Sequence, residues 1–570
     1  MKIHKIILSF SLALIPHLIF SQTLDQRVQN ILDQMTTDEK IDQLTSNTFF
    51  TTGDNTRLDI PGLIMSDGPH GVRFGGHTSF PVGIAIAATF DKKMARQTGM
   101  AMGREFTAAG KNQQLGPCLD LCRDPRNGRS AETGGEDPFL AGEINAAVAE
   151  GIQTSPVFAT AKHFNLVNRQ DYRHKSNVTI SERWLMEHYG LNFKKVVQDA
   201  GVMSVMNAYN LINGVHCSEN QYLMETILRN RWGFPFYVVS DWGAVHNTAN
   251  AIKAGTDICM GSDHYNNELP GLLANGDVSK ATLDEAVSRV LKTKIMAGMM
   301  DYYPVPHRGE RNTERHRQIC LEAGRKSIIL LKNQDRILPF NENRVNKIAL
   351  IGPSANVARL DGFGSSEVEP SKTVSPREGI EQIIGANRVD YQKGCDINST
   401  DRSGFAAAKA TAADADYVVF AGGLDKTMEG EGYGEGGDRK NNSVQLPGVQ
   451  MDLINELASV NPNLVVILKS GGICSVNRGI DNIKGLIYAF YPGQEGGKAL
   501  AEVLFGHYNP AGRLPVSMPR NDHQLPARND NFNDDFGCGY RYYDEMNITP
   551  EFAFGFGMSY TTFSYDNISI

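Results

Sequence analysis

The chain has 570 residues, of which 41% are apolar and 21% are charged, and this composition is ordinary for a folded globular protein. A single hydrophobic core does not extend over so long a chain, so we expect at least two domains. The formal net charge is −8, and the lysines and arginines form no stripe along the sequence. This argues against nucleic acid as a partner. Nothing in the composition indicates an oligomeric state.

Residues 1–22 have the pattern of a secretory signal peptide. Two lysines precede an apolar run at residues 6–20, and a small residue, Ser21, lies where cleavage is expected. Pro16 interrupts the run, which is too short for a membrane-spanning helix. We therefore expect an exported protein, periplasmic or secreted, without a membrane span.

Residues 23–300 alternate short apolar segments with longer amphipathic ones. A helix-start signal at residues 36–39 divides the first segment, which predicts two short helices between Leu24 and Leu44. Apolar runs then predict strands at residues 63–66, 158–161, 202–206, 237–240 and 256–259. Amphipathic stretches predict helices at residues 91–109, 138–152, 181–199, 219–231 and 280–299. So many strand–helix repeats predict an α/β fold that starts with a (β/α)8 barrel of the TIM type.

A second α/β unit is expected after a linker. Residues 301–326 begin with prolines, a glycine and many charges and continue as a connecting helix. Residues 327–545 then resume the alternation, with buried strands expected at 347–352, 417–421, 464–469 and 485–491. This pattern predicts a smaller α/β sandwich, followed by a C-terminal tail at residues 546–570.

Polar side chains stand where several predicted strands end. Asp241 follows the strand at 237–240 and has an indole, Trp242, beside it. In α/β barrels the carboxyl ends of the strands face the active site, so this aspartate is a catalytic candidate, although it can instead cap the next helix. Other strands end in the same way, with Asp67, Lys162, His163 and Tyr209. A ring of such donors and acceptors suits a ligand rich in hydroxyl groups.

A glycine-rich loop at residues 429–439 follows a strand of the second domain and carries Glu429, Glu431 and Glu435. The three carboxylates would repel a phosphate, and no Gly-Lys-Ser/Thr follows, which argues against a nucleotide site. We expect a loop that presents carboxylates to a ligand.

The cysteines and histidines show no metal-ligand spacing. Eight cysteines are dispersed along the chain, and only Cys118 and Cys122 lie close in sequence. Zinc would need a second pair or nearby histidines at ligand spacing. We expect mostly free or buried thiols, no metal ion and no cofactor.

Several motifs, in this order along the chain, resemble glycoside hydrolase family 3. They are residues 65–73 (MSDGPHGVR), 162–164 (KHF), 206–210 (MNAYN), 239–242 (VSDW), 327–333 (SIILLKN), the loop ending in Asp438-Arg439, 491–497 (YPGQEGG), 512–515 (GRLP) and 554–560 (FGFGMSY). The resemblance implies a β-D-glycosidase with a barrel domain followed by an α/β sandwich, and a crevice between the domains for a β-linked oligosaccharide or glucoside.

The resemblance also assigns roles to residues. The nucleophile of the family falls on Asp241, and its sugar-binding residues fall on Asp67, Arg73, Arg129, Lys162, His163, Arg173 and Tyr209. We also expect Trp242, next to the nucleophile, to bind substrate. Two carboxyl groups about 5–5.5 Å apart give double displacement with retention of configuration. Such a mechanism needs an acid with a raised pKa and a nucleophile with a lowered one.

The acid is expected in the glycine-rich loop of the second domain. Glu431, the second glutamate of Glu-x-Glu-Gly, is our prediction. Glu435 is the alternative, because family members usually reach the Asp-Arg pair sooner after the acid than this chain does.

The implied activity is that of an exo-acting β-glucosidase. A β-xylosidase or a β-glycosidase of broad specificity is the alternative, although family xylosidases tend to carry Glu at the position of Asp67, where the shorter side chain leaves room for the exocyclic carbinol of a hexose. A sugar-binding protein without turnover is the rival from another class, and it would need neither Asp241 nor the glutamates of the loop. Many family members continue into a fibronectin type III-like domain after the motif at 554–560, whereas this chain ends at Ile570.

Overall fold

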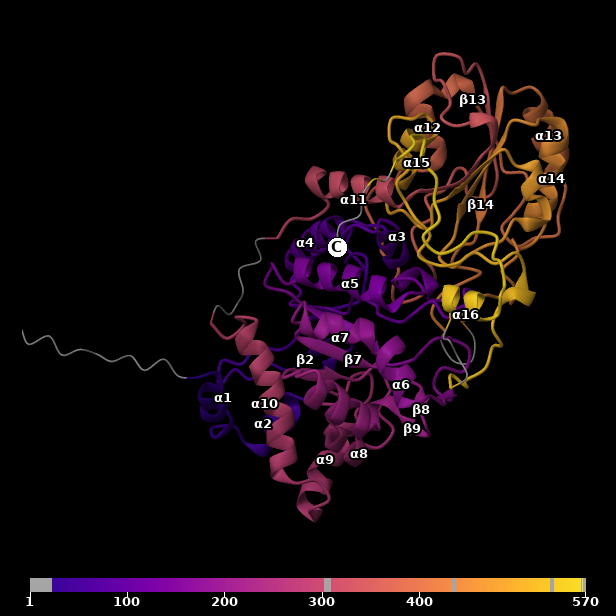
Figure 1. The fold of residues 1–570 in the computed structure, drawn as a ribbon. Coiled ribbons are helices and arrows are strands. Elements are labelled where there is room, and N and C mark those ends of the chain that lie inside the picture. The colour runs from indigo at the N-terminus through magenta and orange to yellow at the C-terminus, as the bar shows by residue number, and fades with distance from the viewer. Residues whose placement is uncertain (1–22, 302–308, 433–436, 534–537, 565, 567–570) are drawn as a thin grey trace, which may run out of the picture.

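The computed structural model describes residues 23–301, 309–432, 437–533, 538–564 and 566. They form two parts, a first domain that runs from indigo to magenta in Figure 1 and a second in orange and yellow. The predicted signal peptide, residues 1–22, lies outside the described residues. Among the described residues, every helix is too short or too polar to span a bilayer.

The first domain begins with the two expected helices, α1 (Leu24–Leu32) and α2 (Thr37–Asp42). Each starts with a capping box, in which the threonine hydroxyl accepts from the third helical N–H and the side chain there accepts from the threonine N–H. The turn between them thus stops the first helix and starts the second, as the sequence predicts.

A parallel sheet forms the centre of this domain. Its strand order is β10 (Tyr237–Val239), β7 (Ser204–Asn207), β5 (Phe158–Phe164), β4 (Gln113–Gln114) and β3 (Met65–Ser66). Parallel bridges continue from β10 to Ile258 and from Cys259 to Thr45. The hairpin of β1 (Ser46–Thr48) and β2 (Thr51–Thr52) then reaches Ile64, next to β3. The pairings therefore run around a ring.

The ring departs from a regular (β/α)8 barrel in one place. β2 runs antiparallel both to β1 and to the segment at Ile64, and no helix separates the two strands of this hairpin. The sequence did not predict β1, β2 or β4, because these strands are very short and polar. The expected α/β fold, with a parallel sheet first and a smaller α/β domain after it, is confirmed.

Long helices cover the sheet. Among them are α4 (Lys92–Ala108), α5 (Pro138–Ile152), α7 (Leu191–Gln198) and α10 (Lys280–Met296). Helices α4 and α5 pack closely through Gly99, where a Cβ would lie 2.2 Å from the Val148 carbonyl oxygen. Other elements of the domain are α3 (Gly83–Ala88), η1 (Ser130–Glu132), β6 (Asn177–Val178), β8 (Leu211–Ile212), β9 (Val215–His216), η3 (Cys217–Glu219), α8 (Thr248–Ala254) and α9 (His264–Asn275).

Two of the predicted helices have a different form. The helix expected at residues 181–199 consists of α6 (Glu182–Trp184), a π-helical turn η2 (Leu185–Tyr189) and α7. Gly190 joins the last two, and a Cβ there would lie 2.6 Å from the Leu185 carbonyl oxygen. The helix expected at 219–231 is the π-helix η4 (Tyr222–Arg231).

The second domain follows the connecting helix α11 (Glu314–Ser327). Its sheet has the order β11 (Ile329–Asn333), β16 (Gly485–Tyr488), β15 (Leu464–Lys469), β14 (Tyr417–Gly423), β12 (Ile348–Ile351) and β13 (Val389–Gln392). All its strands except β11 run parallel. The four strands predicted from sequence are present, whereas the two edge strands, β11 and β13, were missed.

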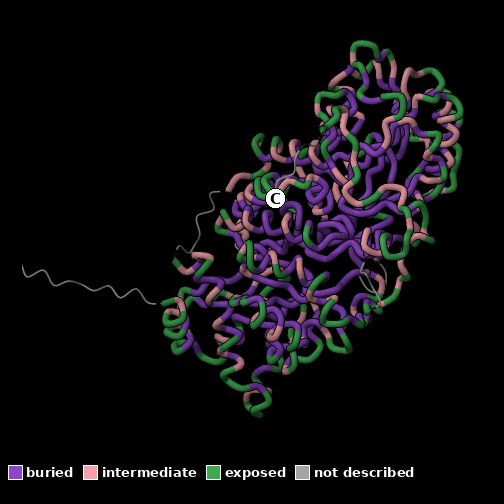
Figure 2. Tube along the Cα trace, in the orientation of Figure 1, coloured by how far each residue is buried: buried purple, intermediate pink, exposed green. Residues whose placement is uncertain are grey.

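Helices cover both faces of this sheet, as Figure 1 shows around β14. One face packs on α12 (Pro376–Ile384) and α15 (Gly496–Leu504), and the other on α13 (Phe405–Ala413) and α14 (Gln450–Val460). The short elements here are η5 (Gln334–Arg336), η6 (Ala386–Arg388), η7 (Asn477–Asn482), η8 (Asp522–Gln524) and α16 (Gly539–Glu545). Figure 2 shows buried segments through the middle of both domains and across their junction.

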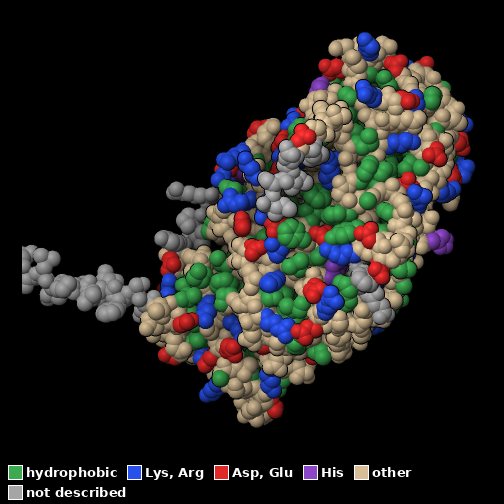
Figure 3. Space-filling model, viewed as in Figure 1, with side chains coloured by type: hydrophobic (Ala, Val, Ile, Leu, Met, Phe, Trp, Pro, Cys, Tyr) green, Lys and Arg blue, Asp and Glu red, His purple; other side chains and the backbone are tan. Residues whose placement is uncertain are grey.

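The surface carries no large region of one charge on the face seen in Figure 3, where acidic and basic side chains are interspersed. All eight cysteines are buried free thiols, as the sequence led us to expect.

The buried carboxylate of Glu105 connects helix α4 to segments that are far from it in sequence. Glu105 on α4 accepts from the Thr78 hydroxyl and the Asn312 N–H, both at 2.7 Å. It also contacts Nδ1 of His77 at 2.6 Å and Nδ1 of His316 at 2.7 Å. Burial would raise the pKa of Glu105, but these hydrogen bonds lower it to about 2.

We expect this network to stabilise the fold above pH 4.5 and to lose its contribution as the pH falls from about 4.5 to about 2, since the folded-state pKa lies below the ordinary pKa of a glutamate. A shift of that size is worth roughly 3 kcal/mol at most. Glu105→Gln should therefore lower the melting temperature near pH 7 and weaken its dependence on acid pH. Glu187→Gln, at an exposed carboxylate that forms an ion pair with the exposed Arg183, is the control and should change little. Equal melting curves for Glu105→Gln and the unaltered protein would contradict this role.

Candidate active site

A cavity lies where the two domains meet. It holds about 430 Å³ of empty space, including the part open to solvent, which is within the usual range for ligand sites. Its lining residues are Phe49, Asp67, Arg73, Arg129, Lys162, His163, Met206, Tyr209, Asp241, Trp242, Ser365 and Glu431. Every site residue predicted from sequence is among them except Arg173, which contacts Glu431 directly.

The first domain supplies most of the walls from the carboxyl ends of its strands. Asp67 follows β3, Lys162 and His163 end β5, Tyr209 follows β7 and Asp241 follows β10. These strands belong to one parallel sheet, so their carboxyl ends lie at the same edge. The second domain adds Ser365 and Glu431 from the loops that follow β12 and β14.

Asp241 is buried, and its two carboxylate oxygens differ in their hydrogen-bond partners. Oδ1 accepts from the Trp242 N–H at 2.8 Å, whereas Oδ2 has no hydrogen-bond partner among the described residues. His163 Nε2 lies 3.6 Å from Oδ2. The Asp241 N–H donates to Asn207 at 3.3 Å, which fixes the backbone at the strand end. One oxygen is thus held and the other is available to a ligand.

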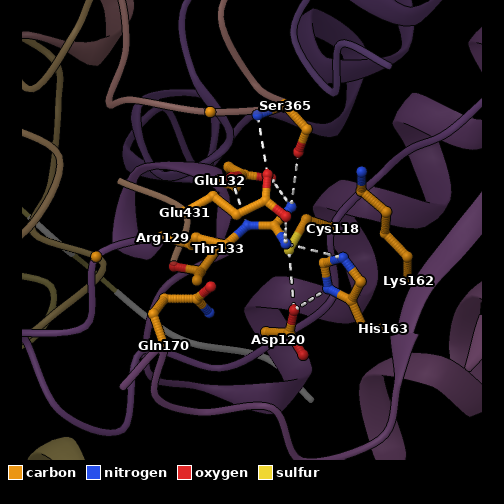
Figure 4. Close-up of polar contacts among 12 residues, drawn as sticks. Cys118, Asp120, Arg129, Glu132, Thr133, Lys162, His163, Gln170, Ser365 and Glu431 are labelled. Atoms are coloured by element: carbon orange, nitrogen blue, oxygen red, sulfur yellow. Dashed lines mark hydrogen bonds and ion pairs between the residues drawn. The ribbon is translucent and has the colours of Figure 1, made fainter. Parts of the chain in front are cut away.

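Glu431 reaches the cavity from the second domain. Its Oε1 lies 2.9 Å from Nη1 of Arg173 and 3.6 Å from Nη1 of Arg129, and its Oε2 accepts from the Ser365 N–H at 2.9 Å. The Glu431 N–H donates to the Phe363 carbonyl oxygen at 2.7 Å. Figure 4 shows the carboxylate between Ser365 and Arg129.

Arg129 is held in place by other buried groups. It makes a bidentate pair with Glu132, with two N–O distances of 2.7 Å, and its Nη1 lies 3.1 Å from His163 Nε2. His163 Nδ1 in turn lies 2.7 Å from Asp120 Oδ2, as Figure 4 shows. The Asp120 carboxylate therefore fixes the orientation of the imidazole.

Asp67 lies beside two cations in the lining of the cavity. Arg73 Nη1 donates to its Oδ2 at 3.1 Å, and Lys162 Nζ is 3.9 Å from Oδ1. Burial raises the pKa of Asp67 to about 6, although Lys162 opposes the shift. The Arg173 guanidinium lies 4.3 Å from the centre of the Tyr209 ring, and Trp242 Nε1 donates to the Phe49 carbonyl oxygen at 2.8 Å.

The pKa shifts of Asp241 and Glu431 have the opposite directions to those expected from the sequence. Burial raises the pKa of Asp241, which sequence analysis expected to be lowered. Burial would also raise the pKa of Glu431, but Arg129, Arg173 and Ser365 hold it well below its usual range. The expectation of a raised pKa for the acid and a lowered pKa for the nucleophile is therefore wrong for the substrate-free protein, because both arginines lie closer to Glu431 than sequence motifs revealed.

One cluster of metal-ligating atoms occurs among the described residues, formed by Cys118, Asp120 and His163. Its members bind each other, since the Cys118 thiol donates to Asp120 Oδ2 at 3.2 Å and the same oxygen contacts His163. Burial and Asp120 raise the pKa of the Cys118 thiol well above its usual range, which disfavours the thiolate that a metal needs. The cluster orients His163, and it does not fit a metal ion.

The Asp438-Arg439 pair anchors the loop that carries Glu431. Asp438 Oδ1 accepts from the backbone N–H groups of Gly128 at 3.1 Å and Gln170 at 2.9 Å, both in the first domain. Arg439 donates to the Pro125 carbonyl oxygen at 3.0 Å. From the sequence this pair was recognised only as a motif. Asp120, Glu132 and Ser365 belong to no recognised motif and were not predicted. Glu435, the alternative acid, lies outside the described residues.

Two family models match the chain. "Glycosyl hydrolase family 3 N terminal domain" covers residues 20–293, and "Glycosyl hydrolase family 3 C-terminal domain" covers residues 328–560. The chain belongs to glycoside hydrolase family 3. It is therefore a glycoside hydrolase with the two-domain architecture seen above.

Named relatives in the family differ in specificity. Thermostable beta-glucosidase B of Acetivibrio thermocellus is 34% identical over 95% of this chain and 74% of its own length. A beta-xylosidase of Formosa agariphila is also 34% identical, over 96% of this chain and 82% of its own. An exo-alpha-(1->6)-L-arabinopyranosidase of Bifidobacterium breve is 31% identical, over 90% of this chain and 70% of its own.

Solved structures agree in fold. The crystal structure of a family 3 beta-glucosidase from Bifidobacterium adolescentis has a TM-score of 0.86 and 30% identity, and the match covers 93% of this chain and 78% of that one.

Proposed function

We propose that the protein is an exo-acting β-D-glucosidase that removes terminal non-reducing glucosyl residues from oligosaccharides or glucosides with retention of configuration. The observation that carries the proposal is a pair of buried carboxylates from different domains, Asp241 and Glu431, in one cavity lined with hydrogen-bonding groups. The relatives named beta-glucosidase support it. Export remains the prediction made from residues 1–22.

Asp241 is the proposed nucleophile. Its Oδ2, which has no partner among the described residues, attacks the anomeric carbon while the bond to the leaving oxygen breaks. Glu431 is the proposed acid/base, which gives its proton to the leaving oxygen. It then takes a proton from the water that hydrolyses the glycosyl ester on Asp241.

Glu431 must gain a proton before it acts as the acid. In the substrate-free protein its ion pairs with Arg129 and Arg173 oppose this. Both arginines are also proposed to hydrogen-bond sugar hydroxyls, so a sugar in the cavity competes for their N–H groups. The sugar also displaces water, and desolvation raises the pKa of a buried carboxyl group. Substrate binding thus favours the protonated acid.

The proposed preference for glucose depends on Asp67. Its carboxylate, held by Arg73 and near Lys162, offers acceptors to a sugar diol. Its short side chain leaves room for the exocyclic carbinol of a hexose. A β-xylosidase or α-L-arabinopyranosidase is the second candidate, because relatives of similar identity carry those names.

A panel of aryl glycosides tests the substrate. We expect kcat/KM for the β-D-glucoside to exceed that for the β-D-xyloside and the α-L-arabinopyranoside by at least about tenfold, since a filled pocket for one extra carbon group is worth that much. Asp67→Glu, which fills the same space, should shift the ratio towards the pentosides. Equal or faster hydrolysis of a pentoside by the unaltered protein would favour the second candidate, and no turnover of any glycoside would favour a sugar-binding protein.

A covalent label tests the nucleophile. A 2-deoxy-2-fluoro-glucoside with a good leaving group should form a stable ester on Asp241, which peptide mapping by mass spectrometry locates. Asp241→Asn preserves the size of the side chain, and we expect it to lose turnover by several orders of magnitude and to take no label. A label on another residue would show that Asp241 does not attack the sugar.

Leaving-group dependence tests the acid. Glu431→Ala should slow substrates with poor leaving groups by about 10²–10⁴-fold, because they need protonation, and slow activated aryl glucosides far less. Added azide should restore turnover of the activated substrates and give a β-glucosyl azide. Glu435→Ala is the matched variant and should cause only a modest loss. The reverse pattern would assign the acid to Glu435.

A further inference from the structure

The second domain has a pocket of its own. It holds about 1120 Å³ of empty space, including the part open to solvent, which is large enough for a small ligand. None of the residues that line it also lines the active-site cavity. They are Pro353, Asn356, Val357, Arg359, Tyr391, Lys393, Asp396, Ile397, Asn398, Asp425, Thr427, Met428 and Lys440. The pocket is therefore a separate candidate site, which the proposed mechanism does not use.

The pocket lies at the carboxyl ends of three parallel strands, two of which, β13 and β14, are labelled in Figure 1. Asn356 follows β12, Lys393 follows β13 and Asp425 follows β14. The chain continues from β12 to β13 on one side of the sheet and from β14 to β15 on the other. Open α/β sheets bind ligands outside the carboxyl ends of their strands, at such a reversal. The fold thus places the pocket where a ligand is expected.

Hydrogen-bonding groups of the pocket are available to a ligand. Asn356, Asn398 and Lys440 are exposed, and their side chains form no hydrogen bond or ion pair with another residue that the structure describes. Beside them, Nη1 of Arg359 lies 3.2 Å from Oδ2 of Asp425. Amide groups and a paired guanidinium and carboxylate offer donors and acceptors side by side, which is what neighbouring hydroxyl groups of a sugar require.

Tyr391 and Val357 add apolar surface to the pocket. The Tyr391 ring is half-buried, with the Arg377 guanidinium 5.4 Å from its centre, and Val357 is 43% exposed. Burial raises the pKa of Tyr391, so its hydroxyl keeps a proton that it can donate. A pyranose ring has hydroxyl groups at its edge and C–H groups on its faces, and these two kinds of surface match the polar and apolar parts of the pocket.

The charges of the lining favour a neutral ligand. Arg359 pairs with Asp425, and Lys393 pairs with Asp396. Lys440 is the remaining cation of the lining. A phosphate would lie close to both carboxylates and would be repelled by them, whereas a sugar hydroxyl can donate to a carboxylate and accept from a cation.

We propose that this pocket is a second carbohydrate site, which binds an oligosaccharide of the kind that the enzyme hydrolyses. The choice of a gluco-oligosaccharide rests on the proposed function. Asp425 and Met428 belong to the loop that continues to Glu431, and the Met428 N–H donates to the Asp425 carbonyl oxygen at 2.9 Å. An oligosaccharide bound here is held next to the loop of the proposed acid, outside the cavity in which the glycosidic bond is broken.

Calorimetric titration with cellotetraose and with laminaritetraose tests the site. Asp241→Asn serves as the parent protein, so that the sugar is not hydrolysed. We expect at least one of the two sugars to bind, and we expect Tyr391→Ala in this parent to bind one molecule fewer per protein. This difference of one molecule holds whether or not the active-site cavity also takes a gluco-oligosaccharide, so it is separate from the test of the proposed function.

Asn356→Ala changes an exposed side chain and guards against misfolding of the Tyr391 variant. It should weaken binding at this site about 2–10-fold, the usual worth of one hydrogen bond, with an unchanged melting temperature. Tyr417→Ala, at a half-buried tyrosine that begins β14 at the opposite edge of the sheet, is the control and should bind as the parent does.

With Asp241 intact, Tyr391→Ala should leave kcat/KM for an aryl glucoside unchanged, because Tyr391 does not line the cavity. Three results would overturn the proposal. They are an unchanged number of bound sugars in Tyr391→Ala, binding of inorganic phosphate in place of either tetraose, and loss of aryl glucoside hydrolysis together with the bound sugar.

Discussion

Glu431 belongs to the second domain, and the two arginines nearest to its carboxylate belong to the first. All three side chains are more than nine-tenths buried, so each charge depends on the others for compensation. Separating the domains would leave a carboxylate on one surface and two guanidinium groups on the other. The ion pairs of Glu431 with the two arginines therefore form only when the two domains are packed together. The geometry of the domain interface thus determines the protonation of the acid.

Glu431 can reach Arg129 and Arg173 because the carboxyl ends of the strands in both sheets face the same cavity. In the first domain, β3, β5, β7 and β10 deliver polar residues at one edge. In the second domain, β12 and β14 are neighbours, and the chain continues from β12 to β13 on one side and from β14 to β15 on the other. Ligands of open α/β sheets bind at such a reversal. Here the loops at the reversal supply Ser365 and Glu431 to a cavity shared with the first domain.

Sequence patterns predicted the features that depend on residues close together in the chain, namely the strands and the polar residues that follow them. Runs of β-branched residues predicted the strands at Tyr237 and Leu464. Strand-end polar residues predicted five residues of the cavity lining, and the resemblance to the family added others such as Arg73 and Arg129. Short polar strands such as β4 have no such pattern. The contact of Arg173 with Glu431 joins residues 258 positions apart, and no periodicity encodes it. The pKa order of Asp241 and Glu431 followed from that contact and could not be predicted without it.

The C-terminal segment also returns to the first domain, where α16 lies beside it in Figure 1. Glu136, at the start of α5, is almost fully buried and accepts from the Ser517 N–H and hydroxyl and from the Tyr540 N–H, all at 2.8 Å. Ser517 and Tyr540 are synthesised 381 and 404 residues after Glu136 itself. During synthesis on the ribosome, the first domain therefore emerges with a carboxylate that lacks these partners, and it reaches its final packing only after residues 517–540 have been made.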